Sequence, residues 1–105
     1  MIANTPEPPY YAVIFTSIRT EEENGYAETA DRMAELAAQQ PGFLGLESAR
    51  NDIGITVSYW DNLDSIRNWK NNAEHLLVQQ AGRDSFYKKY KTRVCKVERD
   101  YGFEK

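Results

Sequence analysis

Four stretches of the chain alternate between apolar and polar positions or are rich in β-branched and aromatic residues, a pattern typical of β-strands. The first, YYAVIFTSI at residues 10–18, is apolar on both faces and therefore needs cover on both sides. The second and third, residues 43–50 and 55–60, flank the turn sequence NDIG and form a predicted hairpin. The fourth is TRVCKVERDY, within residues 91–102. The pattern therefore predicts four strands.

Residues 26–40 carry apolar side chains at helical spacing and form the first predicted helix. The pair Pro41–Gly42 ends this helix. A second helix begins at Asp61 or Asn62, either of which can cap its first turn. Its apolar face has a spacing of three and consists of Leu63, Ile66 and Trp69.

The polar sequence KNN at residues 70–72 predicts a break after this second helix. A further helix is expected from residue 73 to residue 90, and Gly82 weakens its middle. One stripe along this further helix consists of Leu76, Arg83, Tyr87 and Tyr90.

The predicted order is β-α-β-β-α-β, which is the order of the ferredoxin-like α+β fold, a four-stranded antiparallel sheet with its helices on one face. This single domain would span residues 10–105, and residues 1–9, which contain three prolines, would form an extended arm. The uncovered sheet face would leave a larger apolar surface than a soluble monomer normally shows. A second copy packed sheet on sheet in a two-fold dimer is the simplest cover, and a monomer with some exposed aromatics is the alternative.

Length and composition narrow the class of protein. A chain of 105 residues, 41% of them hydrophobic, fits one domain with a modest core. The formal net charge is -3, and no basic stripe is present on which a nucleic acid backbone could lie. The apolar runs are too short for a transmembrane helix, and the first residues lack the features of a signal peptide. We therefore expect a cytoplasmic protein that binds neither nucleic acid nor membrane.

Cysteine and histidine each occur once, as Cys95 and His75. A single cysteine cannot form an internal disulfide, and one histidine far from one cysteine cannot make a closed metal site. No glycine-rich phosphate loop is present. We therefore expect neither a metal site nor a bound nucleotide.

Three stretches together resemble the antibiotic biosynthesis monooxygenase family of dimeric α/β barrels: QPGFLGLESAR, ITVSYWD followed by IRNWKNNAEH, and FYKKYKTRVCKVERDYG. The resemblance runs from Tyr10 to Tyr101, and its most specific part is the pattern W-D-x-L-x-x-I-x-x-W-K-x-x-A-E-H. It implies the fold and the dimer. Family members include cofactor-free oxygenases of polycyclic phenols and quinols, haem-degrading oxygenases and proteins without an assigned substrate, so the fold alone does not fix the chemistry.

The resemblance implies a cofactor-free monooxygenase that uses molecular oxygen as co-substrate and acts on an aromatic, phenol- or quinol-like molecule. Such a molecule must lose a proton before it can pass an electron to oxygen, and histidine is the residue type that most readily exchanges a proton at physiological pH. We therefore expect His75 to be the catalytic base and the break at KNN to turn it toward a cavity. A solvent-exposed or helix-capping histidine beside Glu74 is the alternative.

Aromatic side chains are the expected substrate-binding residues, because small-molecule sites are mostly apolar with a few polar groups. The candidates are Trp60, Trp69, Tyr59, Phe86, Tyr87 and Tyr90. Core packing is the simpler role for Trp69, and the two roles are compatible because a flat substrate can lie against core aromatics. Arg83 is a further candidate, and it and Gln80 would either contact a substrate oxygen or extend to water.

Two other functions remain open on the same fold. One is a non-catalytic small-molecule-binding or stress-related protein. The other is a haem-binding or haem-degrading protein, whose resembling enzymes use an Asn on the first strand, a Trp and a ligand His on the helix. Trp69 matches the Trp, but the first strand contains no Asn and Gln79 stands near the expected ligand position. We therefore expect no haem cofactor.

Overall fold

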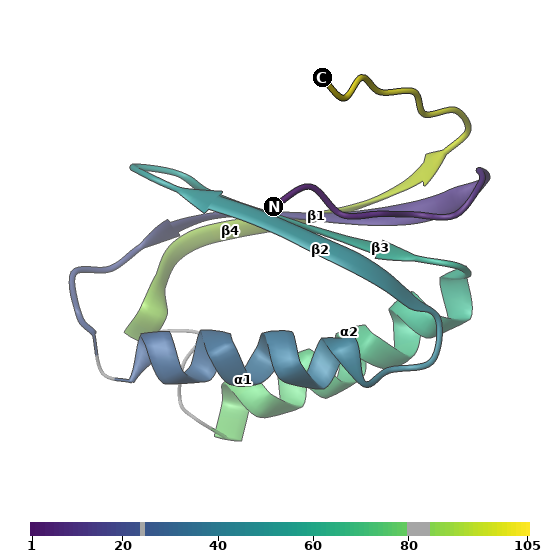
Figure 1. The fold of residues 1–105 in the computed structure, drawn as a ribbon. Coiled ribbons are helices and arrows are strands. Elements are labelled where there is room, and N and C mark those ends of the chain that lie inside the picture. The colour runs from purple at the N-terminus through teal and green to yellow at the C-terminus, as the bar shows by residue number, and fades with distance from the viewer. Residues whose placement is uncertain (24, 80–84) are drawn as a thin grey trace.

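The computed structural model describes residues 1–23, 25–79 and 85–105, which form two layers (Figure 1). One layer is a sheet of the strands β1 (Tyr10–Arg19), β2 (Phe43–Arg50), β3 (Gly54–Trp60) and β4 (Tyr87–Val97). The other layer consists of the helices α1 (Tyr26–Ala38) and α2 (Leu63–Gln79), which cover the same face of the sheet. The order βαββαβ confirms the predicted ferredoxin-like α+β fold. None of the described helices is long and apolar enough to cross a membrane.

The strands lie in the order β2-β3-β1-β4, and every neighbouring pair is antiparallel. In this register Arg50 lies opposite Gly54, Gly54 opposite Ser17, and Ser17 opposite Tyr90. The four residues form one line across the whole sheet, which we call the Gly54 row. Because residues opposite each other share a face, the whole row belongs to the face that the helices cover.

Helix α1 ends at Ala38, two residues before the end that the sequence predicts, and a turn leads from it into β2. Gly42 in this turn has a φ of 86°, and a Cβ on it would overlap the Ser65 side chain of α2. Both the left-handed backbone and the close approach of α2 favour glycine here. The turn therefore fixes the distance between the two helices as well as the direction of β2.

Helix α2 is continuous from Leu63 to Gln79, so the predicted break at KNN is wrong. Its first turn is capped as expected, because the Asn62 side chain accepts a hydrogen bond of 2.7 Å from the Ser65 amide. The helix continues through residues 70–72 because its buried stripe does not stop there. That stripe consists of Ile66, Trp69, Ala73, Leu76 and Leu77. Asn71 and Asn72 are exposed on the opposite side, where polar residues are compatible with a helix.

Strand β4 begins at Tyr87, so the prediction of a helix to residue 90 is also wrong. The pairing with β1 places Ile18 opposite Lys89 and Arg19 opposite Tyr87, which leaves a bulge at Lys88. The extra residue puts Tyr87 and Tyr90 on one face although they are three positions apart. The spacing of three between Tyr87 and Tyr90 therefore resembled the spacing along one face of a helix.

The core lies between the layers and centres on Trp60, which is fully buried together with Ala37 and Ile66. The Trp60 indole donates a hydrogen bond of 2.9 Å to the Ser58 hydroxyl, so its polar atom has a partner. Four half-buried residues pack around this centre: Tyr11, Val13, Phe43 and Trp69.

The outer face of the sheet, away from the helices, is partly covered by the two ends of the chain. The Ala3 amide donates a hydrogen bond of 2.9 Å to Glu47, which also accepts one of 2.7 Å from the Tyr59 hydroxyl. The Tyr10 hydroxyl donates to the Asp100 carboxylate near the other end of the chain. Residues 1–9 are thus an arm that folds back on the sheet, and the last residues lead away from it (Figure 1).

Candidate functional site

A half-open cavity of about 610 Å³ lies between the helices and the sheet face that they cover. This volume falls within the range of roughly 300–1,000 Å³ that small-molecule sites occupy. All four strands and both helices contribute to its wall. Its larger and polar lining residues include Phe15, Tyr26, Met33, Arg50, Trp69, Lys70, Glu74, Tyr87 and Tyr90, and its smaller ones include Val13, Ala30, Thr56, Ser58 and Ala73.

One end of the cavity is an apolar aromatic wall. Trp69 lines the cavity and stacks on Trp60, with ring centroids 6.1 Å apart and an angle of 24° between the planes. Trp60 is 0% exposed and lies behind Trp69, outside the cavity lining. Core packing is the simpler role that the sequence predicts for Trp69, but the residue is only half-buried because its ring forms the cavity wall. A flat ligand could stack on this exposed ring.

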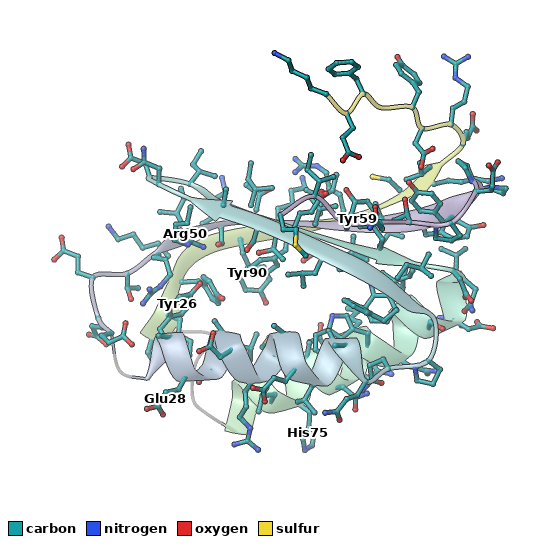
Figure 2. The ribbon with its side chains drawn as sticks, viewed as in Figure 1. Tyr26, Glu28, Arg50, Tyr59, His75 and Tyr90 are labelled. Atoms are coloured by element: carbon teal, nitrogen blue, oxygen red, sulfur yellow. The ribbon has the colours of Figure 1, made fainter. Side chains whose placement is uncertain are left out.

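The other end of the cavity carries hydroxyl and guanidinium groups. Figure 2 shows Tyr26, Tyr90 and Arg50 at this end, with both tyrosines in the space between the layers. The hydroxyls of Tyr26 and Tyr87 share a hydrogen bond, and the Arg19 guanidinium lies 3.4 Å from the centroid of the Tyr26 ring. The arrangement provides hydrogen-bond donors and positive charge beside an otherwise apolar space.

Burial raises the pKa of the Tyr87 hydroxyl well above its ordinary value, and the neighbouring Tyr26 raises it further. The positive charges of Arg50 and Arg19 act in the opposite direction. Tyr87 is therefore a neutral hydroxyl at physiological pH, able to donate a hydrogen bond but not to act as an anionic base.

The Phe15 ring connects β1 to this cluster. Its centroid lies 5.5 Å from that of Tyr87 and 5.2 Å from that of Tyr90. The bulge in β4 is what brings both tyrosines over one phenylalanine. The two phenol rings are thus held in place by packing, which limits the ordering that a ligand would require on binding.

The expectation that His75 faces the cavity is wrong. His75 is exposed, is absent from the cavity wall and points away from the sheet on the outer side of α2 (Figure 2). Because α2 is unbroken, the direction of His75 follows from helical geometry, which places it two positions from the buried Leu77 and from the half-buried Ala73. The catalytic role of His75 therefore stays a prediction without geometric support.

The structure brings together only part of the predicted binding set. Trp69, Tyr87 and Tyr90 line the cavity. Tyr59 lies on the outer face of the sheet instead, because it alternates with Trp60 along β3 (Figure 2). Phe86 is 1% exposed and packs beneath Tyr26 and Tyr87, so it supports the site from the core. Arg83 and Gln80 lie outside the described residues.

Sequence reasoning missed three residues of the site: Tyr26, Arg50 and Ser17. The apolar pattern identifies Tyr26 only as the first position of a helix. Arg50 is the last residue of β2 and Ser17 lies near the end of β1, and only the register of the sheet brings them into one row. The signal that could have indicated them is the glycine at position 54 between them, directly after a turn.

The described residues contain no group of three His, Cys, Asp or Glu side chains close enough to hold a metal ion. The only histidine of the chain lies outside the cavity, so the lining does not supply the histidine that the haem-degrading pattern requires. Haem does not fit these residues, and we derive no step through it.

A ferredoxin-like sheet with an aromatic cavity beneath it defines a class of small α+β domains. Within this class, the family model for antibiotic biosynthesis monooxygenases matches residues 9–81. The uncharacterized protein YqjZ of Bacillus subtilis (strain 168) is 52% identical over 105 residues, which is 98% of this chain and 92% of that protein. The chain therefore belongs to the antibiotic biosynthesis monooxygenase family, as the sequence motifs predicted.

Solved structures share the fold at low sequence identity. SnoaB from Streptomyces nogalater, a cofactor-independent oxygenase, has a TM-score of 0.67 at 12% identity, and the match covers 93% of this chain and 100% of that chain. PA3566 from Pseudomonas aeruginosa has a TM-score of 0.65 at 12% identity, and the match covers 91% of this chain and 99% of that chain. These similarities confirm the fold and carry no residue roles.

Proposed function

We propose that this protein is an oxygenase that needs no bound cofactor and acts on a flat, phenol- or quinol-like small molecule in the cavity. The observation that carries the proposal is the lining of that cavity, an exposed Trp69 ring at one end and hydroxyl and guanidinium groups at the other. The family membership and the cofactor-independent activity named for SnoaB support the same chemistry.

The proposed reaction balances without an external reductant. For a 1-naphthol-like substrate, one oxygen atom of O₂ becomes a new carbonyl at the ring carbon para to the hydroxyl. The other oxygen atom leaves as water, which takes the hydroxyl hydrogen and the hydrogen of that ring carbon. The substrate supplies all the electrons, so the protein has to bind it, favour its deprotonated form and exclude water from the reacting carbon.

Oxygen uptake by the purified protein tests this proposal directly. With 1-naphthol or a larger polycyclic analogue, we expect oxygen uptake to persist after treatment with a chelator. We also expect a quinone product to accumulate. Replacing Trp69 with Ala should remove uptake by removing the stacking surface. Replacing His75 with Ala should leave it unchanged, whereas losing a general base would lower turnover by roughly 10²–10⁴. Binding without any oxygen uptake would contradict the proposal.

That last outcome would favour the second candidate function, a non-catalytic small-molecule-binding protein. A specific observation supports it, since the described part of the cavity wall contains no histidine and the Glu74 carboxylate on it lies 3.7 Å from the Lys70 ammonium. A site without a histidine base suits binding, and it suits catalysis best if the substrate ionises readily.

We also propose a homodimer that packs the outer faces of two sheets together and a cytoplasmic location. Ile18 and Ile55 are 39% and 45% exposed, and the alternation along β1 and β3 assigns them to the outer face. The single Cys95 is compatible with a reducing compartment.

A further inference from the structure

We propose that the Gly54 row is an anion subsite, in which Arg50 binds an ionised oxygen on the aromatic substrate. The ligand chemistry is an oxyanion attached to a flat ring, either an enolate or phenolate oxygen or a carboxylate. This inference rests on the proposed function, because it assumes that the cavity takes an aromatic molecule.

The geometry of the row places the Arg50 guanidinium at the cavity. Its side chain runs from β2 across the backbone of Gly54 in β3 and donates a hydrogen bond to the Ser17 hydroxyl in β1. Ser17 is 1% exposed, so this contact fixes the guanidinium to a buried anchor. The next residue of the row, Tyr90, faces the same cavity from β4.

Gly54 makes this path possible. A Cβ at position 54 would overlap the Arg50 guanidinium, so any other residue would force the side chain off the row. The strand itself does not need glycine here, since no positive φ occurs at Gly54. The glycine therefore serves the position of Arg50, and it gives a way to displace the guanidinium without removing it.

The charge of Arg50 is not neutralised within the described part of the chain. The ion pairs there are Arg67 with Asp64 and Lys70 with Glu74, both within α2. The Ser17 hydroxyl accepts the hydrogen bond of Arg50, and the hydroxyls of Tyr87 and Tyr90 lie at the same end of the cavity. The Arg19 guanidinium adds a second positive charge there. The acidic groups on the wall, Asp31 and Glu74, come from the helices. A cation at the wall of an apolar cavity favours an anionic ligand.

The subsite would also replace the base that His75 does not provide. A cation beside the substrate oxygen lowers the pKa of that oxygen, so the proton can pass to water through the open side of the cavity. The electron pair stays on the substrate as the anion that reacts with O₂. Arg50 thus has the role of a positioning and charge-stabilising group, with no proton transfer of its own.

Paired ligands that share a ring system and differ in charge test the subsite. The enol of 2-hydroxy-1,4-naphthoquinone is ionised at neutral pH, and 2-methoxy-1,4-naphthoquinone is uncharged. Quenching of the tryptophan fluorescence should show that the wild-type protein binds the hydroxy ligand roughly tenfold more tightly, since a charge-assisted hydrogen bond contributes about that factor. A third ligand, 2-naphthoate, compared with 2-naphthamide, shows whether a carboxylate is accepted as well.

Two variants should remove the preference for the charged hydroxy ligand, and one control variant should keep it. Arg50→Gln removes the charge, and Gly54→Ala keeps the charge but displaces it, so both should bind the two naphthoquinones equally. Arg67→Gln is the matched control, because Arg67 is exposed and paired with Asp64 on α2. Circular dichroism checks that each variant is folded, and either of the two row variants alone decides the question.

A bound chromophore gives a readout that a purely structural role would not change. The anion of 4-nitro-1-naphthol absorbs visible light, so its pKa in the cavity can be followed by absorbance. We expect this pKa to be about one unit lower in the wild type than in Arg50→Gln, which corresponds to the same tenfold factor.

The outcomes separate the two proposals. Equal binding of charged and neutral ligands in the wild type, with no effect of Arg50→Gln, would overturn the subsite and leave the aromatic cavity intact. Failure of every naphthalene ligand to bind would overturn the proposed function and the subsite together.

Discussion

Trp60 and Trp69 stack on each other but differ in what lies on their second face. Trp60 is enclosed by Ala37, Ile66 and Phe43, whereas Trp69 faces the cavity. A residue that is enclosed on all sides contributes to folding through its burial, and a residue at a cavity wall also offers its surface to a ligand. We therefore propose that the stacked pair divides structural and binding roles.

We predict opposite effects for the two tryptophans. Trp60→Ala should lower the free energy of unfolding by roughly 3–5 kcal/mol, because it leaves a large void in the core. Trp69→Ala should cost clearly less stability and should weaken the binding of naphthalene ligands more than Trp60→Phe does. Urea unfolding and ligand titration measure the two effects. A Trp69 variant that is as unstable as the Trp60 variant, with ligand affinity unchanged in its folded fraction, would show that the roles are assigned wrongly.

Tyr59 gives a prediction on alkaline stability. Burial first, and then the hydrogen bond and charge of Glu47, raise the pKa of Tyr59 to about 12. In the unfolded chain the hydroxyl ionises near its ordinary value of about 10, so above that pH the unfolded state binds fewer protons than the folded state. Stability due to Tyr59 is therefore fully present below about pH 10 and is lost as the pH rises toward 12.

Urea unfolding at a series of alkaline pH values checks this prediction. Tyr59→Phe should show a shallower loss of stability between about pH 10 and 12 than the wild type. Tyr101→Phe is the matched control, since Tyr101 is 88% exposed and its loss should leave the slope unchanged. Identical slopes for the wild type and Tyr59→Phe would contradict the assignment of the shift to Tyr59.

At the scale of elements, periodicity predicted the first three strands, the hairpin and α1, because each has one pattern bounded by turn residues. The errors occurred where local polarity and long-range packing disagree. The polar residues 70–72 suggested a helix break, but the sheet-facing stripe of α2 continues past them from Trp69 to Ala73 and Leu77. At residues 87–90 a bulge made a strand look helical.

The continuity of α2 leads to a prediction at Asn71, which is exposed in its middle. Asn71→Ala should stabilise the protein by roughly 0.5 kcal/mol, because alanine is the better helix former. Asn71→Pro should destabilise it by about 3 kcal/mol or more, since proline removes a helical hydrogen bond and clashes with the preceding turn. Thermal unfolding measures both. A protein that tolerates Asn71→Pro without loss would restore the break that the sequence suggested.

The candidate site was less predictable than the fold, for a reason that belongs to the whole molecule. Its residues come from all four strands and both helices, and only the strand order and register bring Arg50, Ser17 and Tyr90 into one row. Periodicity within a segment carries no information on which ends meet across a sheet. His75 illustrates the same limit. Its expected position at the cavity rested on the chemistry of histidine alone and not on the direction of its side chain.

The outer face of the sheet is the expected surface for assembly of two copies of the chain. Ile14 and Val57 lie opposite each other on the two central strands and are half-buried, although no helix covers this face (Figure 1). The arm of residues 1–9 contacts Glu47 and Gly45 of β2 through Ala3, and Tyr10 at the start of β1 through Thr5. The central apolar surface is therefore left for a second copy, whose sheet could cover it by a two-fold axis.

Sedimentation should give about twice the chain mass of 12.1 kDa at micromolar protein. Val57→Lys should shift the protein to a monomer, because a sheet-on-sheet contact would bury a long charged side chain. Its neighbour across the strands, Glu47, already accepts hydrogen bonds from the Ala3 amide and the Tyr59 hydroxyl. Ala38→Lys, which adds the same charge at the exposed end of α1, should remain dimeric. If Val57→Lys stays dimeric and folded, the dimer uses another surface, and if the wild type is already a monomer, the apolar face is exposed in solution. The ligand cavity lies on the opposite side of the sheet, so the monomeric variant should still bind naphthalene ligands.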